Sequence, residues 1–471
     1  MYTTFQKVHF TTLRSMNKYI SFFMSGYNIL ETEEKSLLNY IESFKSDHVS
    51  KKKRGVVFTN NTLINKLLDT IPKEVWKNKR LKWLDPGSGI GNIMIHIFYR
   101  LMKSIPIKSV EKRRKHILEN MLYFIEIKTH YISIIEDIFC HNDYNLNIHN
   151  GSYVLMNTDN DNNNLYENDI LFDIIVTNPP YQKPSKDGGI SAKPLYHLFI
   201  QKSLELLKEG GYLVAIHPFT WRRKSREIKL IDELMKYQIS YLYTNNNFQE
   251  FDKSAIHINY YILEKVPIYK KTICDNYFNN KYYRSELLLK NDCEYLPILL
   301  TEETLNIINK LKNINDDKFN IKLESKLSST HSKANTSSTK NDIYMYKNFH
   351  TYSLKKQENI YKYTKEKHPS HDKLKIIMNF KGGYNIFKPF IDYGTMGITD
   401  NALYMEVKDK EQGLKILKIF QSKLFIFILM ITSYNYAPNK KIEFHILNTL
   451  SISDEYELLP TEKHYIEEIV K

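Results

Sequence analysis

The sequence predicts an α/β fold, with a doubly wound, Rossmann-like sheet in residues 51–265 and an α+β domain in residues 266–471. Three observations predict it. Short apolar runs alternate with helical segments along the first range, a glycine-rich turn joins one run to a helix, and a proline-rich turn ends another. Strands that alternate with helices are typical of parallel sheets. The second range is rich in Tyr, Lys and Asn, and its motifs are looser.

The glycine-rich turn follows the first predicted strand, residues 81–84. It comprises residues 85–91, Asp-Pro-Gly-Ser-Gly-Ile-Gly, and a helix is predicted directly after it. Glycines let a ligand approach the backbone, and the helix N-terminus presents free N–H groups to an anionic group. Asp85 leads the turn, and its carboxylate would repel a pyrophosphate but attract the ammonium of an amino-acid moiety. The turn therefore favours S-adenosylmethionine over a dinucleotide.

Residues 121–127 are predicted to form the second strand, with Glu126 near its end. An acid at this position of a doubly wound fold can accept hydrogen bonds from both ribose hydroxyls of a nucleoside. A solvated charge at the end of a strand is the alternative interpretation. The position of Glu126 after the glycine-rich turn favours the ribose role.

A proline-rich turn ends the apolar run of residues 171–177. It reads Asn178-Pro179-Pro180-Tyr181, and two adjacent prolines cannot continue a strand. Open α/β sheets bind ligands at this end of their strands. The turn offers an amide oxygen, a backbone carbonyl and an aromatic face, which together suit a planar amino group conjugated to a π-system. A strand that simply ends in a proline turn is the alternative.

The remaining elements are predicted from local patterns. A helix over residues 31–44 makes residues 1–50 an N-terminal helical extension. A second helix, residues 196–207, is expected to end at Gly210-Gly211. The other predicted elements are strands at 212–216, 257–263 and 373–380, a turn at 392–399, and a buried helix at 424–431 that is too short to span a membrane.

Composition indicates a basic protein that binds a polyanion. The 471 residues contain 67 Lys and Arg against 53 Asp and Glu, a formal net charge of +14. Cys140, Cys274 and Cys293 are scattered without metal-ligand spacing and are expected to be reduced thiols, so no metal site is predicted. The first residues lack the apolar segment of a signal peptide. A cytoplasmic protein with no membrane partner is the expectation.

These motifs resemble those of adenine-N6 DNA methyltransferases of one class. In that class the cofactor motif precedes the catalytic motif, and the target-recognition domain is C-terminal. The resemblance covers about residues 54–265 and implies that a methyl group passes from S-adenosylmethionine to N6 of an adenine flipped out of duplex DNA. It makes double-stranded DNA the partner, and a separately encoded restriction endonuclease a further partner in a restriction-modification system.

The resemblance also implies a role for each motif residue. The Asn178 side-chain oxygen and the Pro179 carbonyl would accept the two amino hydrogens, and the Tyr181 ring would stack on the base. The catalytic set is Asn178, Pro179, Pro180, Tyr181 and Phe248, the last as a second aromatic wall. The cofactor-binding set is Phe58, Thr59, Asp85, Pro86, Gly87, Ser88, Gly89, Gly91, Glu126, Ile127, Ser152 and Asn178.

Two departures from the family pattern keep other functions open. Asn60 stands where the family has proline, and Ser152 stands where it often has an acid that contacts the cofactor's adenine. They are the support for a DNA-binding protein with a decayed methylase domain. A protein glutamine N5-methyltransferase is the other alternative, because a glutamine amide is also a planar amino group. The long tail, the net charge and the Phe58-Thr59 segment argue against it.

Overall fold

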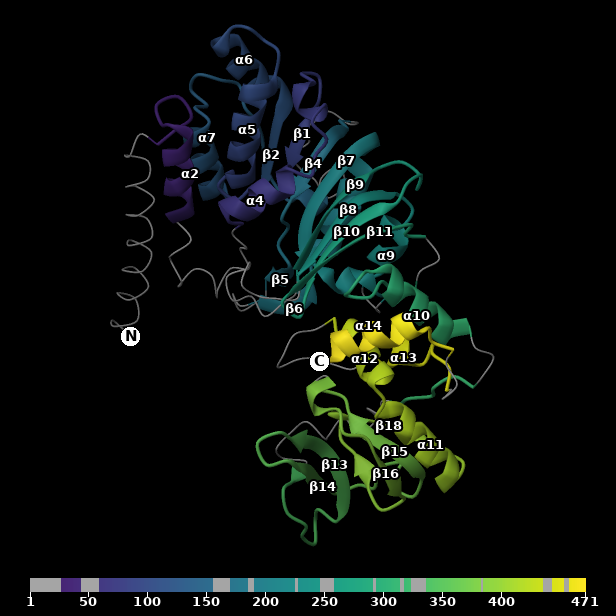
Figure 1. The fold of residues 1–471 in the computed structure, drawn as a ribbon. Helices are drawn as coiled ribbons and strands as arrows, with labels where there is room; N and C mark the ends of the chain where they lie inside the picture. The colour runs from purple at the N-terminus through teal and green to yellow at the C-terminus, as the bar shows by residue number, and fades with distance from the viewer. Residues whose placement is uncertain are drawn as a thin grey trace, which may run out of the picture.

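The computed structural model describes twelve stretches of the chain. They are residues 27–43, 59–155, 170–184, 190–224, 228–245, 258–290, 294–313, 317–322, 336–382, 384–434, 443–452 and 457–471. Figure 1 shows the large sheet at one end of the molecule and two smaller sheets at the other, with α10, α12 and α14 between them.

The large sheet has nine strands in the order β11-β10-β8-β9-β7-β4-β1-β2-β3. Its pairs are parallel from β3 to β7 and between β8 and β10, whereas β9 and β11 run antiparallel to their neighbours. This arrangement confirms the predicted α/β fold. The strands are β1 (Trp83–Asp85), β2 (Leu122–Glu126), β3 (Asn147–Asn150), β4 (Phe172–Thr177), β7 (Leu207–Pro218), β8 (Gln238–Asn245), β9 (Ile258–Glu264), β10 (Thr272–Phe278) and β11 (Lys281–Leu287).

The helices around this sheet begin in different ways. The Asn60 side chain accepts a hydrogen bond from Leu63 N–H at the start of α4, and Gly91 begins α5 with a φ of 81°. The N-terminal helix α2 packs near α5, and Lys103 pairs with Glu34 at 2.6 Å. The helices are α2 (Glu34–Ser43), α4 (Asn61–Leu68), α5 (Asn92–Ser104), α6 (Val110–His116), α7 (Thr129–Ile138), α8 (Tyr196–Leu206) and α9 (Leu230–Leu234).

The glycine pair at 210 and 211 does not end a helix as predicted. Helix α8 ends at Leu206, and β7 starts at once and includes both glycines. The pairing of β7 with β4 shifts register here, from Phe172 opposite Leu207 to Ile174 opposite Tyr212. Gly210 has a φ of 75°, so the pair accommodates an irregularity inside the strand, a common use of glycine in sheets.

Strands β10 and β11 extend the large sheet beyond residue 265. The sequence pattern predicts that they belong to the C-terminal domain. However, β10 pairs with β8 from Ile273 opposite Tyr241 onward, and β11 then forms a hairpin with β10. The apolar core of the large sheet accordingly reaches Leu300.

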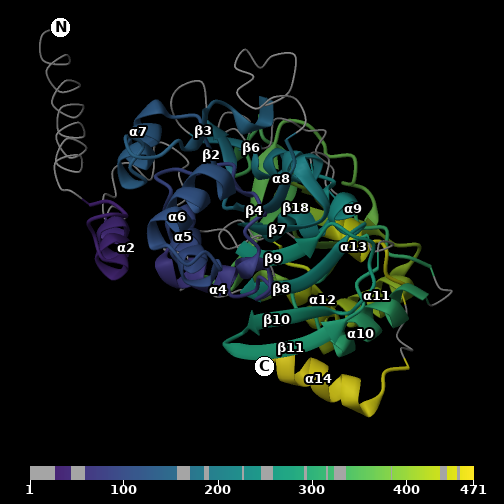
Figure 2. The ribbon, with the colours of Figure 1, turned by 90° about the horizontal axis from the view of Figure 1, so that it is seen from above.

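In its described residues, the C-terminal unit has two small sheets and several helices around a second core. One sheet has the order β12-β14-β13-β17 and the other β16-β15-β18. Figure 2 shows α14 beside β11, where Lys281 pairs with Glu468 at 2.7 Å. The elements are β12 (Thr336–Ser337), β13 (Tyr346–Ser353), β14 (Glu358–Thr364), β15 (Leu374–Asn379), β16 (Phe390–Tyr393), β17 (Gly397–Ile398), β18 (Ala402–Glu406), α10 (Glu302–Asn313), α11 (Lys410–Phe420), α12 (Lys423–Ile431), α13 (Phe444–Leu447) and α14 (Pro460–Val470).

Among the described residues, no helix is both long and apolar enough to cross a membrane. Helix α12 is buried on most of its length, as predicted. A small hairpin of β5 (Gln182–Pro184) and β6 (Ile190–Pro194) follows the proline-rich turn.

Candidate active site

The carboxyl ends of β1, β2 and β4 lie at one edge of the large sheet. Because β1 is parallel to both of its neighbours, Asp85, Glu126 and Asn178 are brought to that edge from three separate parts of the chain. The chain runs from β1 outward through β2 to β3 and then crosses back to β4 on the other side of β1, so the strand order reverses at β1. Such a switch point is where open α/β sheets form a ligand crevice.

The glycine-rich turn is held by its own backbone and by the second strand. Ser88 N–H donates to the Ile125 carbonyl at 3.1 Å, and the Ser88 hydroxyl donates to the Asp85 carbonyl at 2.7 Å. Gly89 has a φ of 55°, and a Cβ built on it meets no atom of the described residues within 4 Å. A Cβ on Gly91 would lie 3.1 Å from the Phe139 ring. Gly89 therefore faces open space, whereas Gly91 is required for packing.

Asp85 is a buried carboxyl at the start of this turn, and its Oδ1 accepts from Gly87 N–H at 3.4 Å. It is 1% exposed, and its Oδ2 has no hydrogen-bond partner among the described residues. Burial raises the pKa of Asp85 to about 7, and the nearby Glu126 charge adds to the rise, although the Gly87 N–H opposes it. A cationic amine placed here would supply the missing partner.

Glu126 closes the turn from the next strand. Its Oε2 accepts from Gly89 N–H at 2.9 Å and its Oε1 accepts from Lys128 N–H at 3.0 Å. Burial raises its pKa. Each carboxylate oxygen can accept a further hydrogen bond, so the contacts within the chain fix Glu126 without using all its acceptor capacity.

Ile127 and Ser152 follow the carboxyl ends of β2 and β3, which are Glu126 and Asn150 respectively. Ile127 follows Glu126 directly and is 64% exposed, which is unusual for a large apolar side chain beside a buried acid. Ser152 is half-buried just after β3. The end of β3 is tied to Glu126, because Asn150 Nδ2 and Gly151 N–H both donate to the Glu126 carbonyl.

Thr59 joins the proline-rich turn to the start of α5. Asn178 Nδ2 donates to the Thr59 hydroxyl oxygen at 2.6 Å, and Asn92 Nδ2 donates to the Thr59 carbonyl at 2.8 Å. The Asn178 Oδ1 is buried and accepts no hydrogen bond within the described part of the chain. The hydrogen bond from Asn178 Nδ2 to Thr59 therefore fixes the direction in which the Asn178 amide oxygen points. Asn92 was not singled out by the sequence analysis, since nothing local marks it.

The two prolines bring the two motifs together. Pro179 is buried and Pro180 is half-buried, and a Cβ on Gly87 would lie 4.0 Å from Pro180 Cδ. Pro86 is also buried, beside Asp85. The glycine-rich turn and the proline-rich turn therefore form one contiguous site.

Tyr181 is placed differently from what stacking on a base needs. Its side chain is 8% exposed, and burial raises its pKa well above the ordinary value. Its carbonyl accepts from Leu195 N–H at 2.9 Å. The ring packs in the core of the large sheet, so it would have to become uncovered for a base to stack on it. Phe58 and Phe248 lie outside the described residues.

His217, at the end of β7, is a buried polar residue that the sequence analysis did not select. Its Nδ1–H donates to the Pro218 carbonyl and its Nε2 accepts from the Tyr261 hydroxyl, both at 3.0 Å. The Tyr196 ring stacks on it with centroids 4.8 Å apart. Burial lowers the pKa of His217 to about 3, so it is neutral at physiological pH. A histidine directly after the apolar run of residues 212–216 was the signal available in the sequence.

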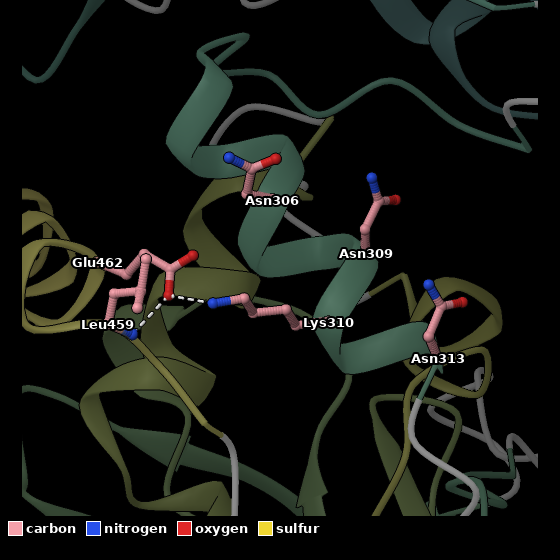
Figure 3. A pocket seen from close by; sticks show the side chains of 6 residues that line it. All are labelled: Asn306, Asn309, Lys310, Asn313, Leu459 and Glu462. Atoms are coloured by element: carbon pink, nitrogen blue, oxygen red, sulfur yellow. Dashed lines mark hydrogen bonds and ion pairs between the residues drawn. The ribbon is translucent and has the colours of Figure 1, made fainter.

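A separate cleft of about 380 Å³ lies in the C-terminal unit, between α10 and α14 (Figure 3). Lys310 crosses it and pairs with Glu462 at 2.7 Å, and Glu462 also accepts from Leu459 N–H. Its lining is Asn306, Asn309, Lys310, Asn313, Leu459 and Glu462, none of which belongs to the sequence-predicted site.

Comparisons with known proteins agree with these motifs. Residues 90–252 match the family described as Eco57I restriction-modification methylase. An "Uncharacterized adenine-specific methylase" of Mycoplasma pneumoniae is 27% identical over a match that covers 44% of this chain and 63% of that relative. The match thus spans less than two thirds of the relative's length.

Two solved structures are similar to this chain at low sequence identity. The DNA-bound ATP-dependent Type ISP restriction-modification enzyme LlaBIII is 13% identical, with a TM-score of 0.50, over 88% of this chain and 40% of that one. The type I restriction-modification methyltransferase subunit from Streptococcus thermophilus is 14% identical, with a TM-score of 0.38, over 55% and 56% of the two chains. The family match confirms the resemblance to restriction-modification methylases.

Proposed function

We propose that this chain transfers a methyl group from S-adenosylmethionine to N6 of adenine in duplex DNA. The observation that carries the proposal is the Asn178 amide, whose nitrogen is held by Thr59 and whose oxygen is buried and unpartnered among the described residues. An acceptor in this position can hold one hydrogen of a planar amino group and draw electron density onto its nitrogen. The Pro179 carbonyl would accept the other.

The groups at this edge of the sheet suit the cofactor. The unpaired Asp85 Oδ2 suits the ammonium group, and the open space at Gly89 admits the methionine chain beside Gly87, Ser88 and Gly91. Glu126 would accept from the ribose, with Ile127 and Ser152 against the adenine ring. When bound, S-adenosylmethionine supplies an electrophilic methyl group. Thr59, and Phe58 by resemblance, would flank that methyl group.

The chain's contribution to the reaction is positioning and electrostatics. Asn178 is not a base, because a neutral amide does not take a proton at physiological pH. It instead orients the target nitrogen toward the cofactor side of the site, where Gly87 approaches Pro180. Holding two reactants in line can account for a large part of a rate enhancement. Tyr181, once uncovered, and Phe248 would flank the flipped base.

The C-terminal unit would hold the DNA. Its β13–β14 hairpin combines lysines and tyrosines, and Lys347 lies over the Tyr361 ring at 3.9 Å. Such a surface suits phosphates and exposed bases. A relative named as an adenine-specific methylase supports adenine as the target. The restriction-modification family makes a separately encoded restriction endonuclease the companion that we expect.

Transfer of tritium from labelled S-adenosylmethionine tests the proposal. Plasmid DNA and a release-factor protein serve as competing acceptors, and long-read sequencing locates modified adenines. Wild-type protein should label DNA, and Asn178→Ala should not, while an exposed-asparagine control, Asn309→Ala, retains activity. Label on protein alone would favour the glutamine methyltransferase. Full activity of a folded Asn178→Ala variant would contradict the proposed role of the Asn178 amide in methyl transfer.

A further inference from the structure

Arg222 is a fully buried cation where the large sheet meets the C-terminal unit. It ends the short helix η5 (Phe219–Arg222), which directly follows β7, and its side chain is 0% exposed. Burial lowers its pKa to about 10, so it stays protonated at physiological pH. Within the part of the chain that the structure describes, Arg222 forms no ion pair. Its charge is met by neutral oxygens instead.

Those oxygens belong to two different parts of the molecule. Nη1 donates to the carbonyls of Pro297 at 3.1 Å and Ile298 at 3.3 Å, and Nη2 donates to the Thr244 hydroxyl at the end of β8. A planar guanidinium can reach three acceptors at once, which a lysine cannot do with the same geometry. Arg222 thus clamps a linking segment, residues 294–300, onto the carboxyl edge of the sheet.

The linking segment is bound equally firmly to the C-terminal unit. The Tyr434 hydroxyl donates to the Leu296 carbonyl at 2.6 Å, and Ile298 N–H donates to the Ile431 carbonyl at 2.8 Å. Phe219, from the same short helix as Arg222, packs in the core of the C-terminal unit. Arg222 therefore lies between that unit and the edge that carries the candidate site.

A chain of contacts continues from η5 to the proline-rich turn. The Thr220 hydroxyl shares a hydrogen bond of 2.9 Å with the Tyr196 hydroxyl at the start of α8. The adjacent Leu195 N–H donates to the Tyr181 carbonyl at 2.9 Å. The turn that carries Asn178 is thus connected through η5 to the linking segment.

We propose that Arg222 is a positioning residue that fixes the proline-rich turn relative to the C-terminal unit. The inference rests on the proposed function: DNA held by the C-terminal unit meets a correctly placed Asn178 only if this connection is intact. Arg222 touches no substrate in this scheme. Its loss should lower the rate of transfer without weakening the binding of DNA or cofactor.

Two conservative variants test the connection without removing the buried charge. Tyr196→Phe deletes the hydroxyl that meets Thr220 and keeps the ring on His217, and Thr244→Val deletes one acceptor of Arg222. Each should lower kcat by about tenfold and leave the KM for DNA within about twofold, because misplacement costs orientation rather than affinity. Arg222→Lys should show the same pattern.

Arg113→Lys is the matched control. Arg113 also donates to two backbone carbonyls, those of Ile107 at 2.8 Å and Met102 at 2.5 Å, but it lies on α6. Its kcat should equal the wild-type value. In the double variant of Arg222→Lys and Tyr196→Phe, the loss of kcat should be smaller than the two single losses combined, because both substitutions interrupt the same chain of contacts. Additive losses, or a raised KM with unchanged kcat, would overturn the proposal.

Hydrogen exchange supplies a readout that does not depend on activity. The Leu195 amide should exchange faster in Arg222→Lys and Thr244→Val than in wild-type protein, and at the wild-type rate in Arg113→Lys. An unchanged exchange rate of the Leu195 amide in both Arg222→Lys and Thr244→Val would refute the connection. If wild-type protein labels no DNA while Leu195 responds as expected, the proposed function fails and the structural link stands.

Discussion

The side-chain nitrogen of Asn178 lies 2.6 Å from the hydroxyl oxygen of Thr59, a residue 119 positions earlier in the chain. That bond leaves the Asn178 oxygen as the end of the amide that has no partner among the described residues. It also ties the proline-rich turn to the segment that precedes α4, since Thr59 lies in that segment. The Thr59 carbonyl in turn accepts from Asn92 Nδ2 at the start of α5. The orientation of the proposed acceptor therefore depends on a residue remote in sequence.

Thr59→Val should lower kcat by roughly 5- to 10-fold, the usual worth of one hydrogen bond, because Asn178 loses the partner that orients it. Thr59→Ser keeps the hydroxyl and should retain most activity. Single-turnover methylation at saturating DNA and cofactor measures the effect. Equal rates for the Val and Ser variants would show that the Thr59 hydroxyl does not orient the amide.

Gly89 and Gly91 should separate cofactor binding from stability. Gly89→Val should abolish S-adenosylmethionine binding, measured by calorimetry, and its φ of 55° adds about 1–2 kcal/mol of backbone strain without a steric clash among the described residues. Gly91→Ala meets Phe139 and has a φ of 81°, so it should lose about 1–2 kcal/mol of stability for the left-handed backbone alone. Thermal unfolding measures the loss of stability in each of the two variants. Unchanged cofactor affinity in folded Gly89→Val would contradict the proposed position of the ligand.

The stability of the ligand-free protein should fall as the pH rises toward neutrality. Burial raises the pKa of Asp85 from 3.8 to about 7, so the folded state holds a proton that the unfolded chain releases. The contribution of this group is complete below the unfolded pKa and is lost as the pH rises through the folded value. Thermal unfolding of wild-type protein and Asp85→Asn, from about pH 4 to about pH 8, measures the difference. The Asn variant should show the smaller decline.

Cofactor affinity should rise over the same pH range, because an ionised Asp85 attracts the ammonium group and a protonated one does not. Calorimetric titrations at pH values on either side of the Asp85 pKa test this expectation. The Asp85→Asn variant should bind S-adenosylmethionine weakly at both pH values. A wild-type affinity that does not change with pH would remove Asp85 from the ammonium site.

Lysines of the β13–β14 hairpin should contribute to DNA affinity through phosphates. Lys347→Gln and Lys355→Gln should each weaken binding uniformly across sequences and reduce the salt slope by about one. Lys112→Gln, an exposed lysine on α6, is the control. Fluorescence anisotropy over a range of salt concentrations provides the slopes. Wild-type slopes in both hairpin variants would place the DNA elsewhere.

Local patterns were sufficient to predict the core of the fold and the position of the main candidate groups. Asp85, Glu126 and Asn178 each stand at the end of a buried strand, and strand ends are visible in apolar periodicity. The bond between Thr59 and Asn178 was not predictable, because it joins segments that only the folded sheet brings together. The same holds for Arg222, whose acceptors in residues 297 and 298 carry no sequence signal.

The glycine pair at 210 and 211 shows why one local signal misled. Paired glycines after an amphipathic segment are typical of a helix end, yet the sheet recruits them as an irregularity in β7. Whether the two glycines end a helix or lie inside a strand depends on the pairing of β7 with β4. This pairing is long-range, so local propensity does not predict it. Strands β10 and β11 were assigned to the C-terminal domain for the same reason, since their partner β8 lies earlier in the chain.

The membership of β10 in the large sheet determines where the chain can be cut. Truncation at residue 265 would leave β8 as a bare edge strand and remove Cys274, Leu287 and Leu300 from the apolar layer that they complete. Unpaired edges with exposed apolar faces favour aggregation. An autonomously folding catalytic half must therefore carry both added strands, and loss of activity in a shorter fragment would report misfolding rather than lost target recognition.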